Sequence, residues 1–392
     1  MPVRYSDLLR AKTAGLFVLM LSLMLIYQAL YVRATAPGQW SALFFNGSKF
    51  AHPNVPNFGY IYPNSSGYDG QWYRTLELDP LLTKGFTQYL DNARLRSRRI
   101  LISAIAGALG RESYPASDYW FIAITDITMA LGGLCFIRLA KDYCPPLTAA
   151  ILYLFIPAIP ASTDRMVVDG PAVAGFLAVL LFFRERRTVP LMLVLAALPL
   201  VRESSLTVTG GVALAYFLAA DFKKMLLSAA TALPTIAWWI YEALRTPYVD
   251  ATHLFSIPLV PQALRLFTLI PRPASPLVAL ALYAIDFVAM ACLLIAFVLF
   301  GNMMIRELQR ARVEGETWIV LPVAVLAAFA GSPEILKDPS GFMRIDSMLI
   351  AWAGLQLMRM RLAWAVAYLP ASSAGLLMFR VKPLLSLVGV NW

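Results

Sequence analysis

The chain has 392 residues, of which 59% are apolar and 14% charged, and its mean hydropathy is +0.65. Soluble domains average roughly 45–50% apolar and about 25% charged residues, so this composition indicates a membrane protein with several spans. It excludes a disordered chain, a secreted disulfide scaffold and a coiled coil. Two histidines argue against a multi-histidine metal site, and three cysteines, which cannot all pair, are interpreted as buried packing residues.

Apolar runs bounded by charge or proline predict an all-α, polytopic membrane protein with about eleven transmembrane helices, within a range of roughly nine to thirteen. The runs cover residues 14–32, 117–137, 146–162, 166–183, 189–201, 204–220, 225–243, 277–300, 317–331, 343–358 and 361–379. The whole chain, 1–392, is interpreted as a single transmembrane domain. The first run follows Arg4, Arg10 and Lys12 and no small-residue cleavage site comes after it. It is therefore expected to be a retained helix that starts in the cytoplasm.

The turns between these runs indicate an orientation. If the chain crosses once at each run, the turns on one side are all basic, whereas the opposite turns carry fewer basic residues and more acids. The basic turns are Arg138 to Lys141, Arg184 to Arg187, Lys223 with Lys224, Arg306 to Arg312, and Arg359 with Arg361. The positive-inside rule assigns them to the cytoplasm, and they explain the net charge of +10 without nucleic acid as a partner.

Two segments are not expected to span. Residues 33–110 form a long first loop on the outer side, and their last part, 99–110, is too short to cross and is predicted to be an interfacial helix. Residues 244–276 form a second outer segment. Prolines spaced through its apolar patches prevent one straight helix, so it could lie along the headgroups.

The segment from Gly67 to Arg74 is the strongest local signal. Glycines on both sides of Tyr68 and Asp69 permit a tight turn with positive φ and a close approach to the carboxylate. Trp72 and Tyr73 supply flat rings that suit a membrane interface or a sugar face. An Asx-turn followed by an aromatic anchor is the structural alternative. Shortly afterwards, Asp79 before a proline is expected to end a helix.

Further charged residues fall at predicted helix ends on the same side. Arg96, Arg98 and Arg99 suit capture of a lipid phosphate or nonspecific headgroup contact. Arg202 and Glu203 could form a local ion pair, or Arg202 could point into a cavity. Purely structural roles would be an N-cap for Asp169, a snorkelling arginine for Arg344, and helix-to-helix hydrogen bonds for Asp126 and Asp286. Together these residues predict an outward-facing polar cavity.

These segments resemble the GT-C class of integral-membrane glycosyltransferases, specifically bacterial, mannosyltransferase-like members. The resemblance rests on Tyr68–Tyr73 followed by Leu76 to Pro80, on Arg96–Arg99, on Asp169-Gly170-Pro171, on Leu200 to Ser204, and on the late Arg344. It covers most of residues 60–210. It implies a long first outer loop with an acidic residue, a polyprenyl-phosphate sugar donor, and a glycan, lipid or protein acceptor. It also implies a bacterial inner membrane with a periplasmic active site among the membrane lipids.

On this hypothesis each residue has an expected role. Asp69 is the catalytic base, and Arg98, Arg99, Arg202 and Arg344 bind the donor phosphate. Tyr68, Gln71, Trp72, Tyr73, Asp169 and Glu203 are the expected substrate-binding residues. Many GT-C members carry an acidic pair in the first loop, whereas Gly70 follows Asp69 here. A need for Mg²⁺ or Mn²⁺ therefore stays open.

Two other functions fit the same residues. A transporter or flippase for a lipid-linked anionic substrate would also need outward cations and broken helices, although the sequence shows no duplicated halves. A non-catalytic assembly subunit would use the first loop to dock a partner.

Overall fold

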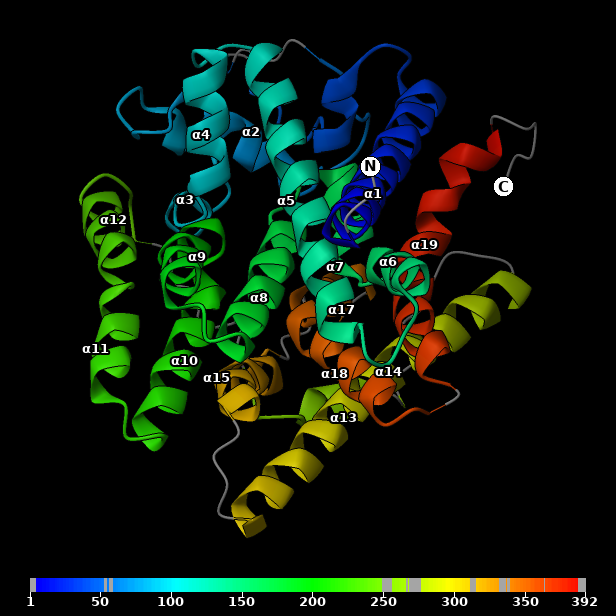
Figure 1. Ribbon diagram of the computed structural model, residues 1–392. Coiled ribbons are helices and arrows are strands. Elements are labelled where there is room, and N and C mark those ends of the chain that lie inside the picture. Colours follow the sequence, from blue (N-terminus) through cyan, green and yellow to red (C-terminus); the bar gives the residue numbers. More distant parts are fainter. Residues whose placement is uncertain are drawn as a thin grey trace.

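The computed structural model is a bundle of helices (Figure 1). It describes residues 5–52, 55, 59–248, 256–265, 267, 276–310, 315–330, 336, 339–362 and 364–386. The helices of the first half are α1 (Tyr5–Thr35), α2 (Gly70–Leu78), α3 (Ala93–Ser97), α4 (Leu101–Gly110), α5 (Ala116–Ala140), α6 (Pro146–Leu154), α7 (Ala158–Arg165), α8 (Asp169–Arg184) and α9 (Thr188–Val201). Those of the second half are α10 (Leu206–Leu218), α11 (Phe222–Ala230), α12 (Leu233–Ala243), α13 (Val260–Arg265), α14 (Pro276–Arg310), α15 (Gly315–Phe329), α17 (Pro339–Ile345), α18 (Ser347–Arg359) and α19 (Ala365–Ser386).

The all-α prediction is confirmed for the described residues, and every predicted apolar run contains helix. Within the part of the chain that the structure describes, three helical segments are long and apolar enough to cross a membrane: Thr13–Thr35, Ala116–Ala140 and Ala279–Gln309. A fourth span results if α6 and α7, which are bent by 60° at their junction, count as one. Shorter apolar helices, including α9 and α15, accompany them. The chain therefore has the apolar helices of a multi-pass membrane protein.

Apolar side chains on the outside of the bundle agree with that conclusion. Leu193 is 67% exposed, Leu226 63% and Ile240 61%, and all three lie on helices at one edge of Figure 1. Water would be an unfavourable neighbour for such a surface, whereas lipid chains would not.

Several predicted runs are interrupted, and proline is the local cause in two of them. The run 146–162 breaks between α6 and α7 beside Pro157, and the run 225–243 divides into α11 and α12 just before Pro234. Proline has no N–H for the helical ladder and its ring collides with the preceding turn. The run 343–358 is also divided, because α17 ends at Ile345 and α18 begins at Ser347.

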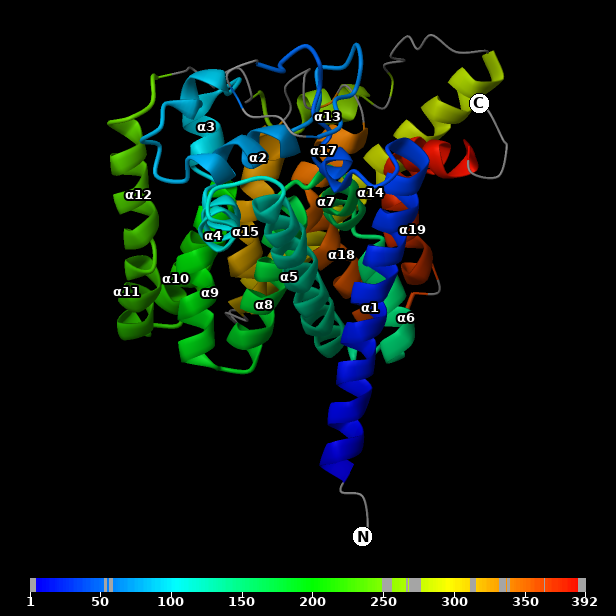
Figure 2. The same ribbon diagram turned by 90° about the horizontal axis from the view of Figure 1, so that it is seen from above.

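The first-loop helices gather at one end of the bundle. Figure 2 shows α2 and α3 beyond the ends of α9, α10 and α15, together with α13, while the amino end of α1 lies at the opposite end. The predicted interfacial segment forms α4, which packs on α2 and α5. In the second outer segment only α13 and residues 244–248, 256–259, 267 and 276 are described, and α13 is a short helix, as the prolines predict.

Polar residues inside the bundle are paired between helices. Gln28 of α1 donates to Asp126 of α5 at 3.0 Å, and Arg265 of α13 donates to Asp286 of α14 at 2.7 Å. The helix-to-helix hydrogen bonds expected for the two aspartates are therefore present. Their burial without such partners would carry a large desolvation cost.

The contact between α10 and α15 depends on a glycine. An added Cβ on Gly211 would lie 2.3 Å from the carbonyl oxygen of Ile319, whereas one on the neighbouring Gly210 would meet nothing within 4 Å. The two helix backbones therefore touch at Gly211, in the way that small residues permit in membrane bundles.

We expect Gly211→Ala to destabilise the protein by about 1–3 kcal/mol, because the overpacked α10–α15 contact must open. Gly210→Ala is the matched control and should gain about 0.5–1 kcal/mol from better helix propensity. Thermal unfolding of both variants in detergent compares them. Equal melting temperatures for the two variants would contradict the close packing of these helices.

Candidate functional site

Asp69 lies at the turn that leads into α2. Gly67, two residues earlier, has a φ of +74°, as the predicted tight turn requires. Gly70 permits a close approach, but to the protein itself: an added Cβ would lie 2.2 Å from the carbonyl oxygen of Arg165. The Asp69 side chain does not cap the helix, although the residue occupies the N-cap position. The carboxylate is therefore available for other partners, and the Asx-turn alternative is not what the structure contains.

Two arginines from distant parts of the chain hold the Asp69 carboxylate. Arg96 of α3 places Nη1 3.1 Å from Oδ1, and Arg344 of α17 places Nη1 3.0 Å from Oδ2. The Asp69 side chain is 18% exposed and both arginine side chains 11%, so the contact is largely shielded from water. Arg344 also lies over the ring of Tyr68, with 4.9 Å from Cζ to the ring centre.

A second ion pair lies beside the first. Arg99, between α3 and α4, donates from Nε and Nη2 to the two carboxylate oxygens of Glu203, each at 2.6 Å. Its third nitrogen, Nη1, donates to the Tyr73 hydroxyl at 2.9 Å. This bidentate geometry is the strong form of an arginine–carboxylate contact. It ties the first loop to the break between α9 and α10.

Asp169 links the remaining arginines. It is the first residue of α8, with Val168 at the cap position, so the N-cap expected for Asp169 is wrong by one residue. Its carboxylate pairs with Arg202 and lies 3.6 Å from Nε of Arg344. Arg202 and Glu203 thus have different partners, and the local ion pair considered for them is absent from the described structure. We call Asp69, Arg96, Arg99, Asp169, Arg202, Glu203 and Arg344 the arginine–carboxylate cluster.

The electrostatics of the cluster keep its first-loop acid charged. Burial alone would raise the pKa of Asp69, but the charges of Arg96 and Arg344 outweigh it and hold that pKa below its usual value. Burial also disfavours the charge of Glu203, and Arg99 again outweighs it, so the Glu203 pKa is lowered. Both carboxylates are therefore ionised at neutral pH.

The charges nearly balance. Arg96 also binds Asp91 through two hydrogen bonds of 2.9 and 2.7 Å, so four arginines face the carboxylates of Asp69, Asp91, Asp169 and Glu203. Every one of these arginines already has a carboxylate partner. To bind one of these arginines, an anionic ligand must therefore displace the carboxylate that the arginine already contacts.

The sequence identifies most of the cluster, but Arg98, one of the arginines expected to bind the donor phosphate, lies outside it. Arg98 points away from Asp69: its Nε lies 3.8 Å from Glu242, and its guanidinium lies over Trp239. Arg96, which is not among the arginines expected to bind the donor phosphate, contacts Asp69 instead. The nearest signal in the sequence is Asn92, a residue type that favours the N-cap position and that caps α3, the short helix carrying Arg96.

The predicted aromatic and amide ligands are mostly engaged in the protein itself. Trp72 is 5% exposed and Tyr73 is fully buried, so neither ring offers a face to a sugar in this conformation. Gln71 accepts from the Gly47 backbone N–H and donates to the Ser66 carbonyl oxygen, which braces the first loop. Of the three predicted aromatic ligands, Tyr68 alone is a partly exposed ring beside the cluster.

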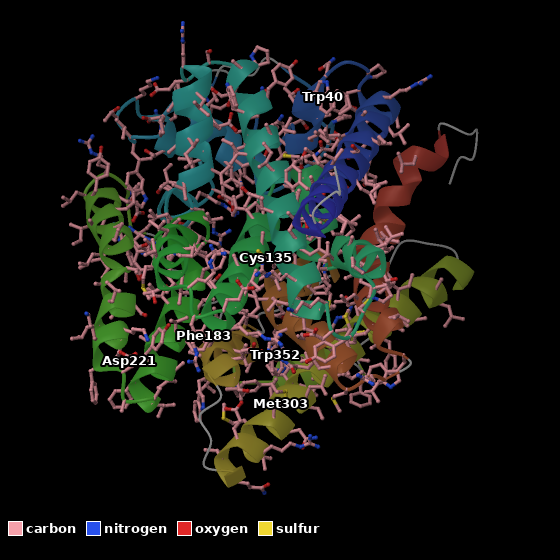
Figure 3. All side chains as sticks on the ribbon, in the orientation of Figure 1. Trp40, Cys135, Phe183, Asp221, Met303 and Trp352 are labelled. Atoms are coloured by element: carbon pink, nitrogen blue, oxygen red, sulfur yellow. The ribbon has the colours of Figure 1, made fainter. Side chains whose placement is uncertain are left out.

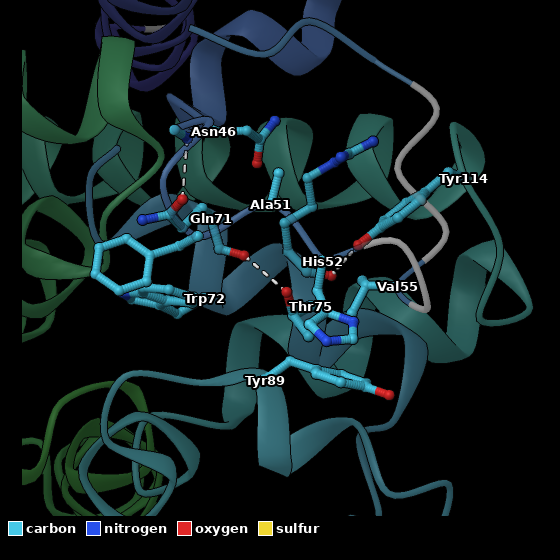
Figure 4. Close-up of a pocket in the computed structure, with 12 residues that line it drawn as sticks. Asn46, Ala51, His52, Val55, Gln71, Trp72, Thr75, Tyr89 and Tyr114 are labelled. Carbon is cyan, nitrogen blue, oxygen red and sulfur yellow. Dashed lines mark hydrogen bonds between the residues drawn. The ribbon is translucent and has the colours of Figure 1, made fainter. Parts of the chain in front are cut away.

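A small cavity lies against α2 between residues of the first loop (Figure 4). Gln71, Trp72, His52 and Tyr89 contribute to its walls, and the last two rings pack 4.2 Å apart between centres. Its volume of about 30 Å³ accommodates no more than a water or two. It is too small for a sugar, so the cluster and not this cavity is the candidate site.

The acids of the site do not fit a divalent cation. Asp69, Asp169 and Glu203 each face arginines, and among the described residues no three His, Cys, Asp or Glu side chains gather in a metal-binding arrangement. Mg²⁺ prefers carboxylates and water without competing cations. A divalent cation would have to displace an arginine from each of these acids.

Comparison of the chain with protein-family models, with curated proteins and with solved structures finds no match. A function for the protein is therefore proposed from the geometry of the cluster alone.

Further along α2, Glu77 is a buried acid that the cluster does not use. It is 0% exposed and neither of its carboxylate oxygens has a hydrogen-bond partner among the described residues. Nearby, Arg74 is committed to Asp118 through a 2.7 Å ion pair. Burial, and then the charge of Asp118, raises the pKa of Glu77 well above its usual value. Glu77 is thus more stable protonated in the folded protein than in the unfolded chain.

A raised pKa predicts a pH dependence with a definite sign. Wild-type stability should fall by roughly 1 kcal/mol per pH unit above the unfolded pKa of about 4, until the pH reaches the folded pKa of Glu77. Glu77→Gln removes this loss, so the variant should be the more stable protein at pH 8 and should lose its advantage near pH 4. Melting temperatures across that range test this, with the partly exposed Glu112→Gln as control. A wild-type advantage at pH 8 would refute the assignment.

Proposed function

We propose that the protein is a membrane glycosyltransferase of the GT-C type that transfers a hexosyl or pentosyl group from a polyprenyl-phosphate donor to an acceptor hydroxyl. The observation that carries the proposal is the convergence of Asp69, Arg344, Arg99 and Arg202 from separate segments. A carboxylate among arginines supplies both a proton acceptor and ligands for a phosphate. The acceptor is a glycan, a lipid or a protein.

The proposed step is an inverting displacement. The acceptor oxygen attacks the anomeric carbon while its proton passes to the Asp69 carboxylate. The bond between that carbon and the donor phosphate oxygen breaks, and the electron pair leaves with the phosphate. Arg99, Arg202 and Arg344 stabilise the charge that develops there.

Donor binding also activates the base. An Asp69 paired with two arginines is a weak base, because its pKa lies far from the working pH. A donor phosphate attracts Arg344 away from Asp69, and loss of that charge raises the carboxylate pKa. The same exchange that binds the donor therefore prepares Asp69 to accept a proton.

The proposed setting is a bacterial inner membrane with about eleven spans, a cytoplasmic amino terminus and the cluster open to the periplasm. The end-to-end separation of the α1 amino end and the first-loop helices supports this orientation (Figure 2). Basic residues in the turns around Arg138, Arg186 and Lys224 support it as well.

Asp69→Asn should lower sugar transfer from a labelled polyprenyl-phosphate sugar by about 10²- to 10⁴-fold, because Asn cannot accept the proton. The variant should fold, since Arg96 keeps Asp91 and Arg344 keeps Asp169 as partners. Transfer is measured in reconstituted vesicles, with gel filtration and melting temperature as controls for folding. Unchanged turnover in a folded variant would remove Asp69 from the reaction.

Two arginines close in sequence, Arg96 and Arg98, allow a comparison between a residue of the cluster and one outside it. Arg96→Gln should reduce turnover roughly tenfold or more, because Arg96 is the contact that holds the Asp69 carboxylate in position once Arg344 has turned to the donor phosphate. Arg98→Gln is the matched control, since Arg98 contacts Glu242 and Trp239 instead, and it should keep near wild-type turnover. The reverse ranking in the same vesicle assay would show that the site is misassigned.

A flippase for a lipid-linked anionic substrate is the alternative, and one observation favours it. The bent pair α6 and α7 is the kind of interrupted helix that transporters use at their binding sites. Movement of a labelled lipid-linked substrate across vesicles without chemical change would identify this activity.

A further inference from the structure

A large cavity lies at the end of the bundle opposite to the cluster. The position of α8 establishes this, because its first residue, Asp169, belongs to the cluster and its last residue, Arg184, lines the cavity. A helix of this length separates its ends by about 22–24 Å. The cavity has a volume of about 690 Å³, well within the range of ligand sites. Three of its residues, Phe183, Asp221 and Met303, are labelled in Figure 3.

The charged residues of this cavity include more cations than acids. Arg184, Arg186, Lys224 and Arg359 face Asp221, Glu307 and Glu316. Two of the cations are satisfied: Lys224 pairs with Asp221 at 2.7 Å, and Arg359 pairs with Glu316 at 2.6 Å. Glu307 accepts a hydrogen bond from the Thr317 hydroxyl.

The other two cations lie on one turn and lack a close acid. Arg184 approaches Asp142 only to 4.0 Å. Within the described part of the chain, no carboxylate forms an ion pair with Arg186. The neighbouring carboxylate, Glu185, pairs with Arg138 and Arg187 instead. Arg184 also donates from Nη1 to the Leu139 carbonyl oxygen at 3.5 Å. Two exposed guanidinium groups without a close carboxylate therefore border the cavity.

The remaining wall is apolar and aromatic. Phe183 and Tyr216 pack with their ring centres 5.2 Å apart, and Ala215 and Met303 complete this side. The cationic edge can bind a phosphate group, and the apolar wall beside it leaves room for an apolar portion of the same ligand.

We propose that this cavity binds a phosphate group through Arg184 and Arg186. Arginine is the side chain whose planar donors match phosphate oxygens in pairs. The phosphate could belong to an anionic phospholipid, whose headgroup lies at the level of helix ends, or to a water-soluble compound. Basic pockets between transmembrane helices capture anionic headgroups in this way. The site is independent of the glycosyl transfer proposed above.

The experiment uses the full chain and two probes. Inorganic pyrophosphate is titrated into detergent-purified protein, and the melting temperature is followed. In parallel, the protein is placed in phosphatidylcholine nanodiscs with or without phosphatidylglycerol, and retained lipid is measured by native mass spectrometry. A response to pyrophosphate identifies a soluble source, and retention of phosphatidylglycerol identifies a lipid source. Either response supports the site, and a response to neither overturns it.

Matched variants assign the response to the cavity. Arg184→Gln with Arg186→Gln should weaken binding by about tenfold or more, because charge-assisted contacts are lost. Arg187→Gln with Lys223→Gln removes the same charge from exposed residues of the turns around the cavity that do not line it, and should bind as wild type does. Equal losses in both double variants would show general attraction and overturn the proposal.

A single variant keeps the test valid if the double variant is unstable. Arg186→Gln should fold, since no described carboxylate forms an ion pair with Arg186. It should still bind more weakly than wild type, because half of the proposed phosphate contacts are lost. Wild-type binding by this variant would also overturn the proposal.

Discussion

Buried charge needs a partner, and that constraint organises the end of the bundle at which the first-loop helices lie. Asp69, Asp169 and Glu203 would each be costly inside an apolar assembly, and so would the arginines opposite them. Pairing these residues with one another satisfies both sides at once. Because the partners come from the first loop, α8, the α9–α10 break and α17, the ion pairs also fix where the first loop lies on the bundle. Loss of one partner leaves an uncompensated buried charge. A substitution in such a contact therefore destabilises the protein more than one in an exposed ion pair does.

The lengths of the helices explain why the charged residues of the cluster can lie between the helix ends and the first loop. A helix as short as α9 rises about 21 Å, which is less than the roughly 30 Å thickness of a bilayer core. Its end at Val201 is followed by Arg202, and the unpaired backbone groups there lie among polar side chains instead of lipid. The first-loop helices α2 and α3 then complete that end of the molecule (Figure 2). Short apolar helices, the charged side chains at their ends and the first-loop helices beside those charges are thus parts of one arrangement.

Much of this could be predicted from the sequence, for physical reasons that also define the failures. Apolar runs report burial in lipid or protein, so every run contains helix. Charges at run ends identify Arg202 and Arg344, and the flanking glycines identify Asp69, as residues that meet. Hydropathy does not report where a helix breaks inside a run, and the α6–α7 and α11–α12 breaks are not predicted although Pro157 and Pro234 are visible in the sequence. To predict that Arg96 and not Arg98 contacts Asp69, one must know where the five-residue helix α3 begins and which of its side chains face the bundle. Burial of Trp72 and Tyr73 depends on contacts with distant residues, such as Phe121 against Tyr73, which no local pattern contains.

The balance of charge in the cluster limits what any ligand can do there. Each arginine has a carboxylate, so an incoming phosphate gains only the difference between its own contacts and those it displaces. That difference in free energy is more favourable when the displaced carboxylate can accept a proton and so lose its negative charge. Asp69, released from Arg344, can accept a proton from a hydroxyl, whereas Glu203, held by Arg99 through two hydrogen bonds, has no such outlet. In the proposed mechanism, Asp69 is therefore the acid whose release is coupled to proton transfer, whereas Glu203 keeps the first loop in place.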